Sequence, residues 1–69
     1  MKKLTIKKAA KQLDFSTEYQ FVEYVNETFI NGNFSSLKRL FLELDKTGRK
    51  LVLLNCDKEV SDYLIINAL

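Results

Sequence analysis

The four consecutive aliphatic residues at positions 51–54, Leu-Val-Leu-Leu, constrain the fold of this chain more than any other feature. Side chains along a strand alternate between its two faces, so a strand of four aliphatics needs other elements to cover both faces. Turn-forming residues flank the run, with Gly48 before it and Asn55 after it. The run therefore predicts a buried strand in a sheet that has helices packed against it.

A helix is predicted on each side of this strand. Before the strand, apolar residues recur at the i, i+3, i+4 and i+7 spacing of one helix face, at Leu37, Leu40, Phe41 and Leu44. Gly48 predicts the end of that helix, because glycine readily adopts the left-handed conformation that stops helices. After the strand, Asp57 predicts the N-cap of a final helix, whose apolar face includes Val60 and Leu64.

The amino-terminal half gives a more ambiguous pattern. Residues 4–6 favour a short strand, and residues 8–13 favour a helix. Residues 17–28 stay open between the two. Their Tyr, Phe and Val content favours a strand, whereas the spacing of Phe21 and Val25 favours a helix.

The alternation of strands and helices defines the expected fold. Such alternation predicts parallel strand pairing with right-handed crossovers. A chain of 69 residues is long enough for one domain, and no linker or internal repeat divides it. We therefore expect a single α/β domain over residues 1–69, with about three strands and about three helices.

The composition argues against chemistry at an active site. The chain has no histidine and one cysteine, so it lacks the residues that most often serve as general base or structural zinc ligand. Neither of its two glycines belongs to a phosphate-binding loop. We expect Cys56 to act as a small buried hydrophobe. The prediction is a protein that is not an enzyme, with no catalytic or metal-binding residue and no cofactor.

Charge is segregated along the chain. The first eleven residues carry five lysines and no acid, whereas residues 12–37 carry acids and no base. Such a basic segment contacts an acidic partner or nucleic acid in some proteins. The alternative is a solvated lysine face that keeps an exposed edge strand soluble, and we favour it because five lysines make a weak nucleic-acid footprint.

Membrane insertion is not expected. No apolar run approaches the roughly 20 residues that span a bilayer. The basic start Met1-Lys2-Lys3 is not followed by an apolar stretch, so we expect no signal peptide. A single cysteine fits a reducing compartment, and we therefore expect a cytoplasmic protein.

Two stretches carry a resemblance to a known family. One reads Phe29-Ile30-Asn31-Gly32-Asn33-Phe34-Ser35-Ser36-Leu37, and the other reads Gly48-Arg49-Lys50-Leu51-Val52-Leu53-Leu54-Asn55. With Val60, Leu64 and Leu69 after them, residues 29–69 resemble the second half of a STAS domain, the fold of anti-sigma factor antagonists. In that family a Phe-Ile-Asp-Ser-Ser-Gly-Leu turn precedes a helix and a Gly-Arg-Arg/Lys-Leu-x-Leu-x-Asn strand.

The resemblance implies a non-catalytic regulatory module that docks a partner protein through the turn and the helix after it. It places the partner-binding site at Asn31, Gly32, Asn33, Phe34, Ser35 and Ser36. The family's phosphorylated serine corresponds to Gly32, so Ser35 and Ser36 become the phosphoacceptor candidates. Their other role is to cap the helix. Phe34 is either an exposed anchor for the partner or a core residue. The exposed edge of a small sheet further predicts a homodimer.

A second resemblance gives an alternative function. Residues 6–16 read Ile-Lys-Lys-Ala-Ala-Lys-Gln-Leu-Asp-Phe-Ser, and residues 6–29 resemble a helix-turn-helix of the AraC type. This resemblance implies a small DNA-binding protein. Asp14 takes the place of the turn glycine. The would-be recognition helix carries Glu18, Glu23 and Glu27, which repel DNA phosphates, so nucleic acid is not the expected partner.

Overall fold

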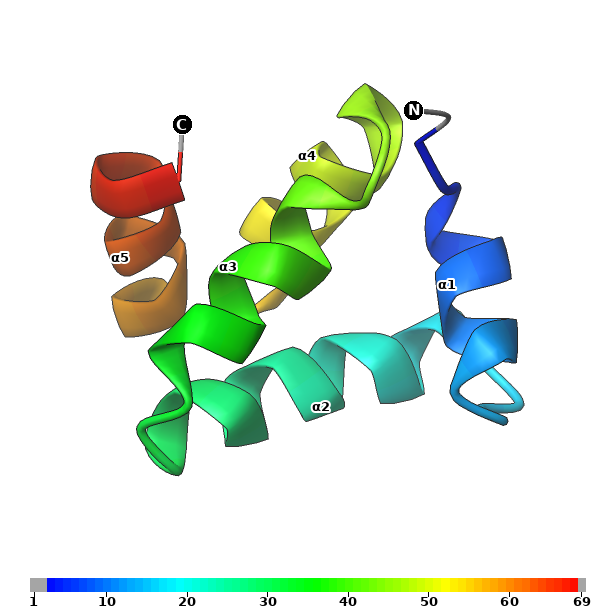
Figure 1. Cartoon of the computed structure of the whole chain (residues 1–69), viewed down its shortest axis with the longest axis horizontal. Helices are drawn as coiled ribbons and strands as arrows, with labels where there is room; N and C mark the ends of the chain where they lie inside the picture. Colours follow the sequence, from blue (N-terminus) through cyan, green and yellow to red (C-terminus); the bar gives the residue numbers. More distant parts are fainter. Residues whose placement is uncertain (1–2, 69) are drawn as a thin grey trace.

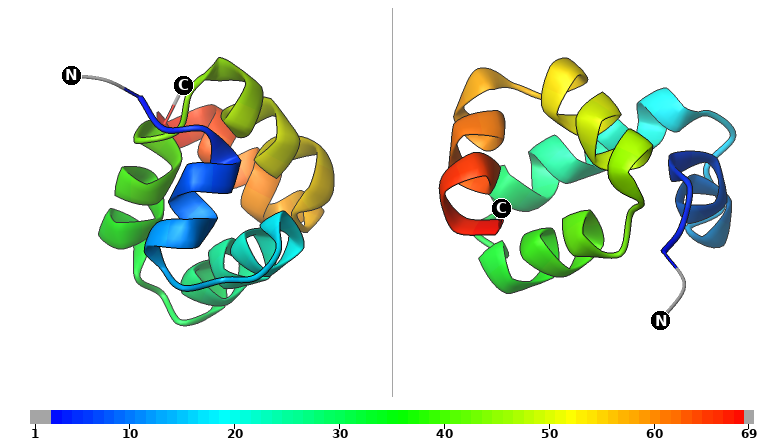
Figure 2. Two further views of the ribbon diagram at one scale, coloured as in Figure 1. Left: turned by 90° about the vertical axis from the view of Figure 1, so that its right-hand side faces the viewer. Right: turned by 90° about the horizontal axis from the view of Figure 1, so that it is seen from above.

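The structure is a computed structural model that describes residues 3–68. Within this range the chain forms five helices, α1 Ile6–Gln12, α2 Glu18–Ile30, α3 Phe34–Leu42, α4 Lys46–Asn55 and α5 Lys58–Ala68. In Figure 1, α2 runs along the lower edge, α1 and α5 stand above its two ends, and α3 and α4 cross between them. Figure 2 shows the same arrangement from the side and from above. Lys2 of the basic segment and Leu69, which belongs to the STAS resemblance, lie outside the described residues.

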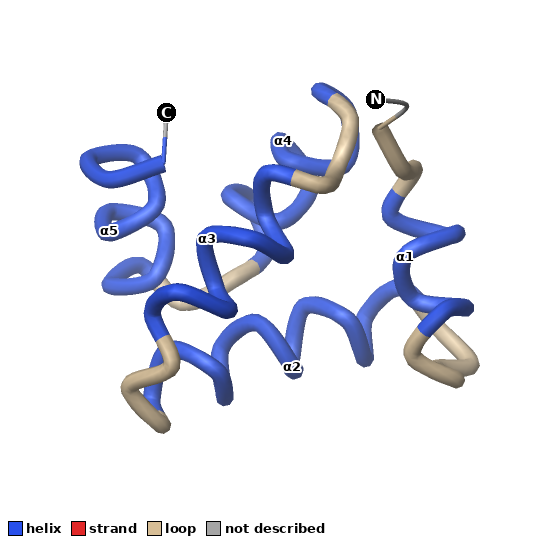
Figure 3. The backbone as a smooth tube through the Cα atoms, in the orientation of Figure 1, coloured by secondary structure: helices blue, strands red, loops and turns tan. Residues whose placement is uncertain are grey.

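The predicted α/β fold with about three strands is wrong. Figure 3 shows only helices and connecting segments over residues 3–68, and no strand. The sheet that a STAS-like fold requires is therefore absent from this range. The sheet edge on which the expected homodimer rested is absent with it. An isolated parallel bridge between Leu4 and Leu44 is the one β-type pairing in the described part of the chain.

Residues 51–54 belong to α4 and not to a strand. Val52 is 0% exposed, whereas Leu54 is 71% exposed. A strand covered on both faces would bury both side chains. A helix turns about 100° per residue, so Leu54 points about 200° away from Val52. Leu51 and Leu53 are partly buried against the core on either side of Val52. The prediction of a strand here was wrong because four adjacent aliphatics show neither the strand nor the helix period.

Gly48 lies inside α4 and does not end the preceding helix. Helix α3 ends at Leu42, and Asp45 is the N-cap of α4. The Gly48 amide donates a 2.8 Å hydrogen bond to Asp45 Oδ1. A Cβ atom at Gly48 would lie 3.3 Å from the Leu44 Cβ and 3.4 Å from the Ile6 amide nitrogen. The missing side chain therefore lets the start of α4 approach the start of α1.

The predicted strand at residues 4–6 is reduced to the single bridge at Leu4. The Leu4 amide donates to the Glu43 carbonyl over 2.8 Å, and the Asp45 amide donates to the Leu4 carbonyl over 2.7 Å. Helix α1 begins directly afterwards, with Thr5 as its N-cap. The predicted helix at residues 8–13 is confirmed with bounds shifted by one or two residues. The entry segment is thus held against the junction of α3 and α4.

The ambiguous segment at residues 17–28 is helical. Thr17 caps α2 and forms a capping box with Gln20, whose side chain accepts from the Thr17 amide over 3.2 Å. One face of the helix is buried, at Phe21, Val22, Val25 and Thr28. The helical spacing of Phe21 and Val25 therefore decided the conformation over the strand preference of the single residues.

The core gathers around α3. Leu37 and Phe41 are buried in this helix, and Leu44 is buried just after it. The predicted apolar face is confirmed at these three positions, while Leu40 is only partly buried. Helix α5 begins directly after Asp57, as predicted, and buries Val60 and Leu64. The core thereby joins all five helices.

Candidate functional site

Asn31, Gly32 and Asn33 form the turn between α2 and α3, and residues 34–36 begin α3; we call residues 31–36 together the α2–α3 turn. Gly32 has a φ of 78°, which favours glycine because it carries no Cβ. The Gly32 amide donates to the Phe29 carbonyl over 3.0 Å, and the Asn33 amide donates to the Thr28 carbonyl over 3.1 Å. This pair of bonds is the Schellman motif that ends a helix. The turn is therefore a rigid projection at one end of α2.

Phe34 lies at the first position of α3 and is 43% exposed. Its ring packs against Phe29, with ring centres 5.6 Å apart, and against Tyr63, with ring centres 5.1 Å apart. Phe29 and Tyr63 also pack edge to face at 5.7 Å. The ring is thus neither a free anchor nor a core residue. One side of the ring packs against two aromatic rings, and the other side is exposed to solvent.

Two further exposed apolar side chains belong to the helices that carry Phe29 and Tyr63. Ile30 adjoins Phe29 and is 73% exposed, and Ile66 follows Tyr63 by three residues and is 77% exposed. Residues three apart on a helix are surface neighbours. Carboxylates flank the patch on α5, at Glu59 and Asp62. The α2–α3 turn therefore lies beside apolar side chains that have carboxylates on the α5 side, whereas Lys38 follows Phe34 by one helical turn on α3.

The two serines of the turn differ in exposure. Ser35 is exposed and Ser36 is partly buried. Both lie in the first turn of α3, where the Asn33 side chain makes no capping hydrogen bond and no acidic residue is present. A phosphate here would meet the positive end of the helix dipole. Phosphorylation of Ser35 or Ser36 stays a prediction.

A substitution at Ser35 measures how well this helix start accepts negative charge. We expect Ser35→Glu to raise the free energy of unfolding by about 0.3–1 kcal/mol, because a carboxylate in the first turn interacts favourably with the helix dipole. Thermal unfolding followed by circular dichroism measures the change. Ser35→Lys is the matched control and should lower the stability. Equal effects of both variants would contradict the expectation.

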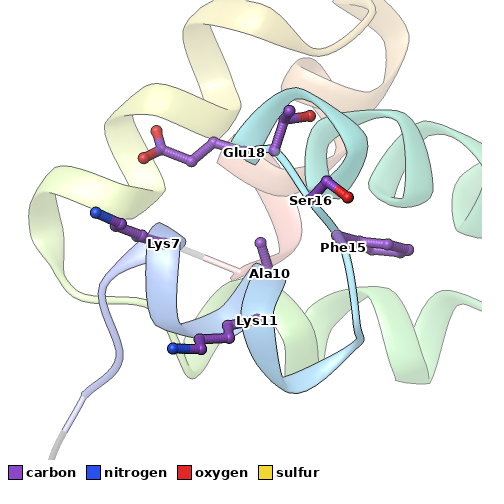
Figure 4. A pocket seen from close by; sticks show the side chains of 7 residues that line it. Lys7, Ala10, Lys11, Phe15, Ser16 and Glu18 are labelled. Carbon is purple, nitrogen blue, oxygen red and sulfur yellow. The ribbon is translucent and has the colours of Figure 1, made fainter.

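The α1–α2 turn lies at the other end of α2. Helix, turn and helix follow one another here as the alternative interpretation predicts, and Asp14 adopts a left-handed φ of 62° in place of the turn glycine. Beside the turn is an open hollow of about 420 Å³. Figure 4 shows Lys7 and Lys11 extending from α1 at one side of this hollow and Phe15 at the other. The wall is completed by Ala10, Ser16, Thr17 and Glu18, and we call it the basic hollow.

A second hollow lies next to the first along α2. It has a volume of about 220 Å³ and is lined by Phe15, Gln20, Glu23, Tyr24 and Glu27. The Phe15 and Tyr24 rings pack edge to face with centres 5.7 Å apart. Phe15 therefore separates the basic hollow from this one, which we call the acidic hollow. Sequence reasoning missed both, although the i, i+4 spacing of like charges in each helix was visible.

The chemistry of the remaining residues is limited. Burial is the largest cause that raises the pKa of the Cys56 thiol, and the Asp57 charge raises it further against an opposing backbone hydrogen bond. A raised pKa leaves little thiolate at neutral pH. Cys56 is partly buried and packs against the core. No group of three or more potential metal ligands occurs among residues 3–68.

Comparison with known protein families, with curated proteins and with solved structures finds no significant match. Over the described range, no helix combines the length and the apolar character that crossing a membrane requires. The function therefore has to be argued from the surfaces of this chain alone.

Proposed function

We propose that this chain is a non-catalytic protein-binding module that docks a partner protein through the α2–α3 turn and the start of α3. The observation that carries the proposal is the half-exposed ring of Phe34. It is held in place by Phe29 and Tyr63, and Ile30, the residue after Phe29, is exposed. A side chain that is already fixed loses little entropy on binding, and aromatic rings dominate interface energies.

The charges on the α5 side of this patch indicate which charge the partner carries. Glu59 precedes Tyr63 by one helical turn, and Asp62 precedes it directly. Both carboxylates are exposed. Complementary charge favours association and excludes acidic competitors. We therefore expect a partner segment in which an apolar side chain that packs on Phe34 is flanked by lysine or arginine.

A binding experiment with purified components tests the proposal. A partner first found by co-purification is made separately, and its affinity is measured by isothermal titration calorimetry. Phe34→Ala should weaken binding by about 30-fold, the effect of one interface hot spot of roughly 2 kcal/mol. Ile30→Ala, which removes a mostly exposed side chain and leaves the core intact, should weaken it in the same direction.

Leu54→Ala is the matched control, because Leu54 is as exposed as Ile30 but belongs to α4. It should leave the affinity unchanged. The proposal would be overturned by a partner whose affinity responds to Leu54→Ala but not to Phe34→Ala or Ile30→Ala.

DNA binding is the second candidate function, favoured by the left-handed Asp14 within the helix, turn and helix of residues 6–30. The exposed carboxylates of α2 oppose it, because Glu18, Glu23 and Glu27 would each repel DNA phosphates. Fluorescence anisotropy with a labelled DNA duplex at low and at moderate salt separates the two functions. Affinity that falls steeply as salt rises would favour DNA binding. We expect no binding of the duplex at either salt concentration.

A further inference from the structure

The two hollows at the α1–α2 turn adjoin each other and carry opposite charge. Phe15 lines both of them, so they are directly adjacent. The basic hollow is lined by two lysines, Lys7 and Lys11, and by one acid, Glu18, so its net charge is positive. The acidic hollow has Glu23 and Glu27 and no basic residue. The surface formed by the two hollows is therefore complementary in charge to the same surface of a second copy.

The spacing of the charges also matches. Lys7 and Lys11 are four residues apart on α1, and Glu23 and Glu27 are four residues apart on α2. Four residues of a helix correspond to about 6 Å along its axis. All four side chains are exposed. A lysine pair laid against a glutamate pair can therefore contact it one to one.

We propose that this surface binds a second copy of the chain in a two-fold symmetric dimer. The basic hollow of each copy faces the acidic hollow of the other, with the Phe15 and Tyr24 rings near the symmetry axis. A two-fold interface requires that residue i contacts j and j contacts i. Adjacent hollows of opposite charge meet this requirement, because one rotation brings both lysine pairs onto both glutamate pairs.

The adjacency of the hollows also fixes the size of the assembly. Complementary patches on opposite sides of a protein produce open chains of copies, whereas a self-complementary patch on one side is used up when two copies meet. We therefore expect assembly to stop at two. This inference is independent of the proposed function, because the α2–α3 turn lies at the far end of α2, a helix of 13 residues.

Sedimentation velocity on the full chain tests the dimer over a concentration series at about 50 mM and about 500 mM salt. We expect a monomer–dimer equilibrium at low salt that shifts towards monomer at high salt. Lys7→Glu with Lys11→Glu should abolish the dimer, and so should Glu23→Lys with Glu27→Lys. Mixing these two double variants should restore a one-to-one dimer, because a face with only acidic charges then meets one with four lysines and the single acid Glu18.

Lys46→Glu with Lys50→Glu is the control, since it makes the same charge change at exposed positions of α4. It should leave the dimer intact, and circular dichroism verifies that each variant folds. Monomer at every concentration, species that grow beyond two copies, or a dimer that survives both charge reversals would each overturn the proposal. If Phe34→Ala weakens partner binding while the dimer persists, the two surfaces are separate.

Discussion

Replacing Phe41 by alanine should lower the melting temperature by about 20 °C, the largest stability effect we expect from a single truncation. Phe41 is among the largest fully buried side chains. Its truncation leaves a cavity and costs about 3–5 kcal/mol. A domain of this length has a total stability of about 3–10 kcal/mol, so a large share is lost. Thermal and urea unfolding followed by circular dichroism measure the change.

The neighbouring residue provides the control for this prediction. Leu42 follows Phe41 in α3 and is exposed. We expect Leu42→Ala to cost about 1 kcal/mol, clearly less than Phe41→Ala, since Leu42 is 37% exposed and its truncation leaves no enclosed cavity. Similar losses in the two variants would show that Phe41 is not at the centre of the core.

Placing a carboxylate at position 52 should prevent folding. Val52 is fully enclosed in the core, and a buried charge without a partner costs several kcal/mol, comparable to the whole stability of a domain this small. We expect Val52→Asp to give the circular dichroism spectrum of an unfolded chain. Loss of amide dispersion in a nuclear magnetic resonance spectrum is the second measurement.

The same substitution two residues later distinguishes a helix from a strand. Leu54 lies on the solvent side of α4 in its last turn, so Leu54→Asp should cost only about 1 kcal/mol, from the lower helix propensity of aspartate and its unfavourable interaction with the helix dipole. In a strand covered on both faces, Val52→Asp and Leu54→Asp would be equally harmful. Unfolding by both variants would therefore contradict the helical assignment of this segment.

The contrast between α3 and α4 shows which parts of the fold could be predicted from the sequence. Helix α3 carries apolar residues at a helical period, and its buried face was predicted at Leu37 and Phe41. Helix α4 has its four aliphatics in one block, which contains no period. The remaining indication was Asp45, whose side chain caps the helix that follows. Gly48 follows Asp45 by three residues and favours the end of a helix there, so the capping role of Asp45 was not predicted.

The candidate sites were predictable to different degrees. The turn at Asn31, Gly32 and Asn33 follows from local chemistry, since these residues favour turns wherever they occur. The packing of Phe34 against Tyr63 joins residues 29 positions apart and depends on how α3 and α5 meet. The two hollows likewise depend on the packing of α1 and of Phe15 against α2. Tertiary contacts of this kind leave no pattern in one short sequence.

The bridge at Leu4 has a consequence for measuring how the amino-terminal segment docks. Nearly every other backbone amide in residues 3–68 that forms a hydrogen bond does so within a helix or a local turn. The amides of Leu4 and Asp45 instead bond across 39 and 41 positions of the chain. Hydrogen–deuterium exchange at these two sites therefore reports the detachment of residues 3–5 from the α3–α4 junction, separately from the fraying of any helix.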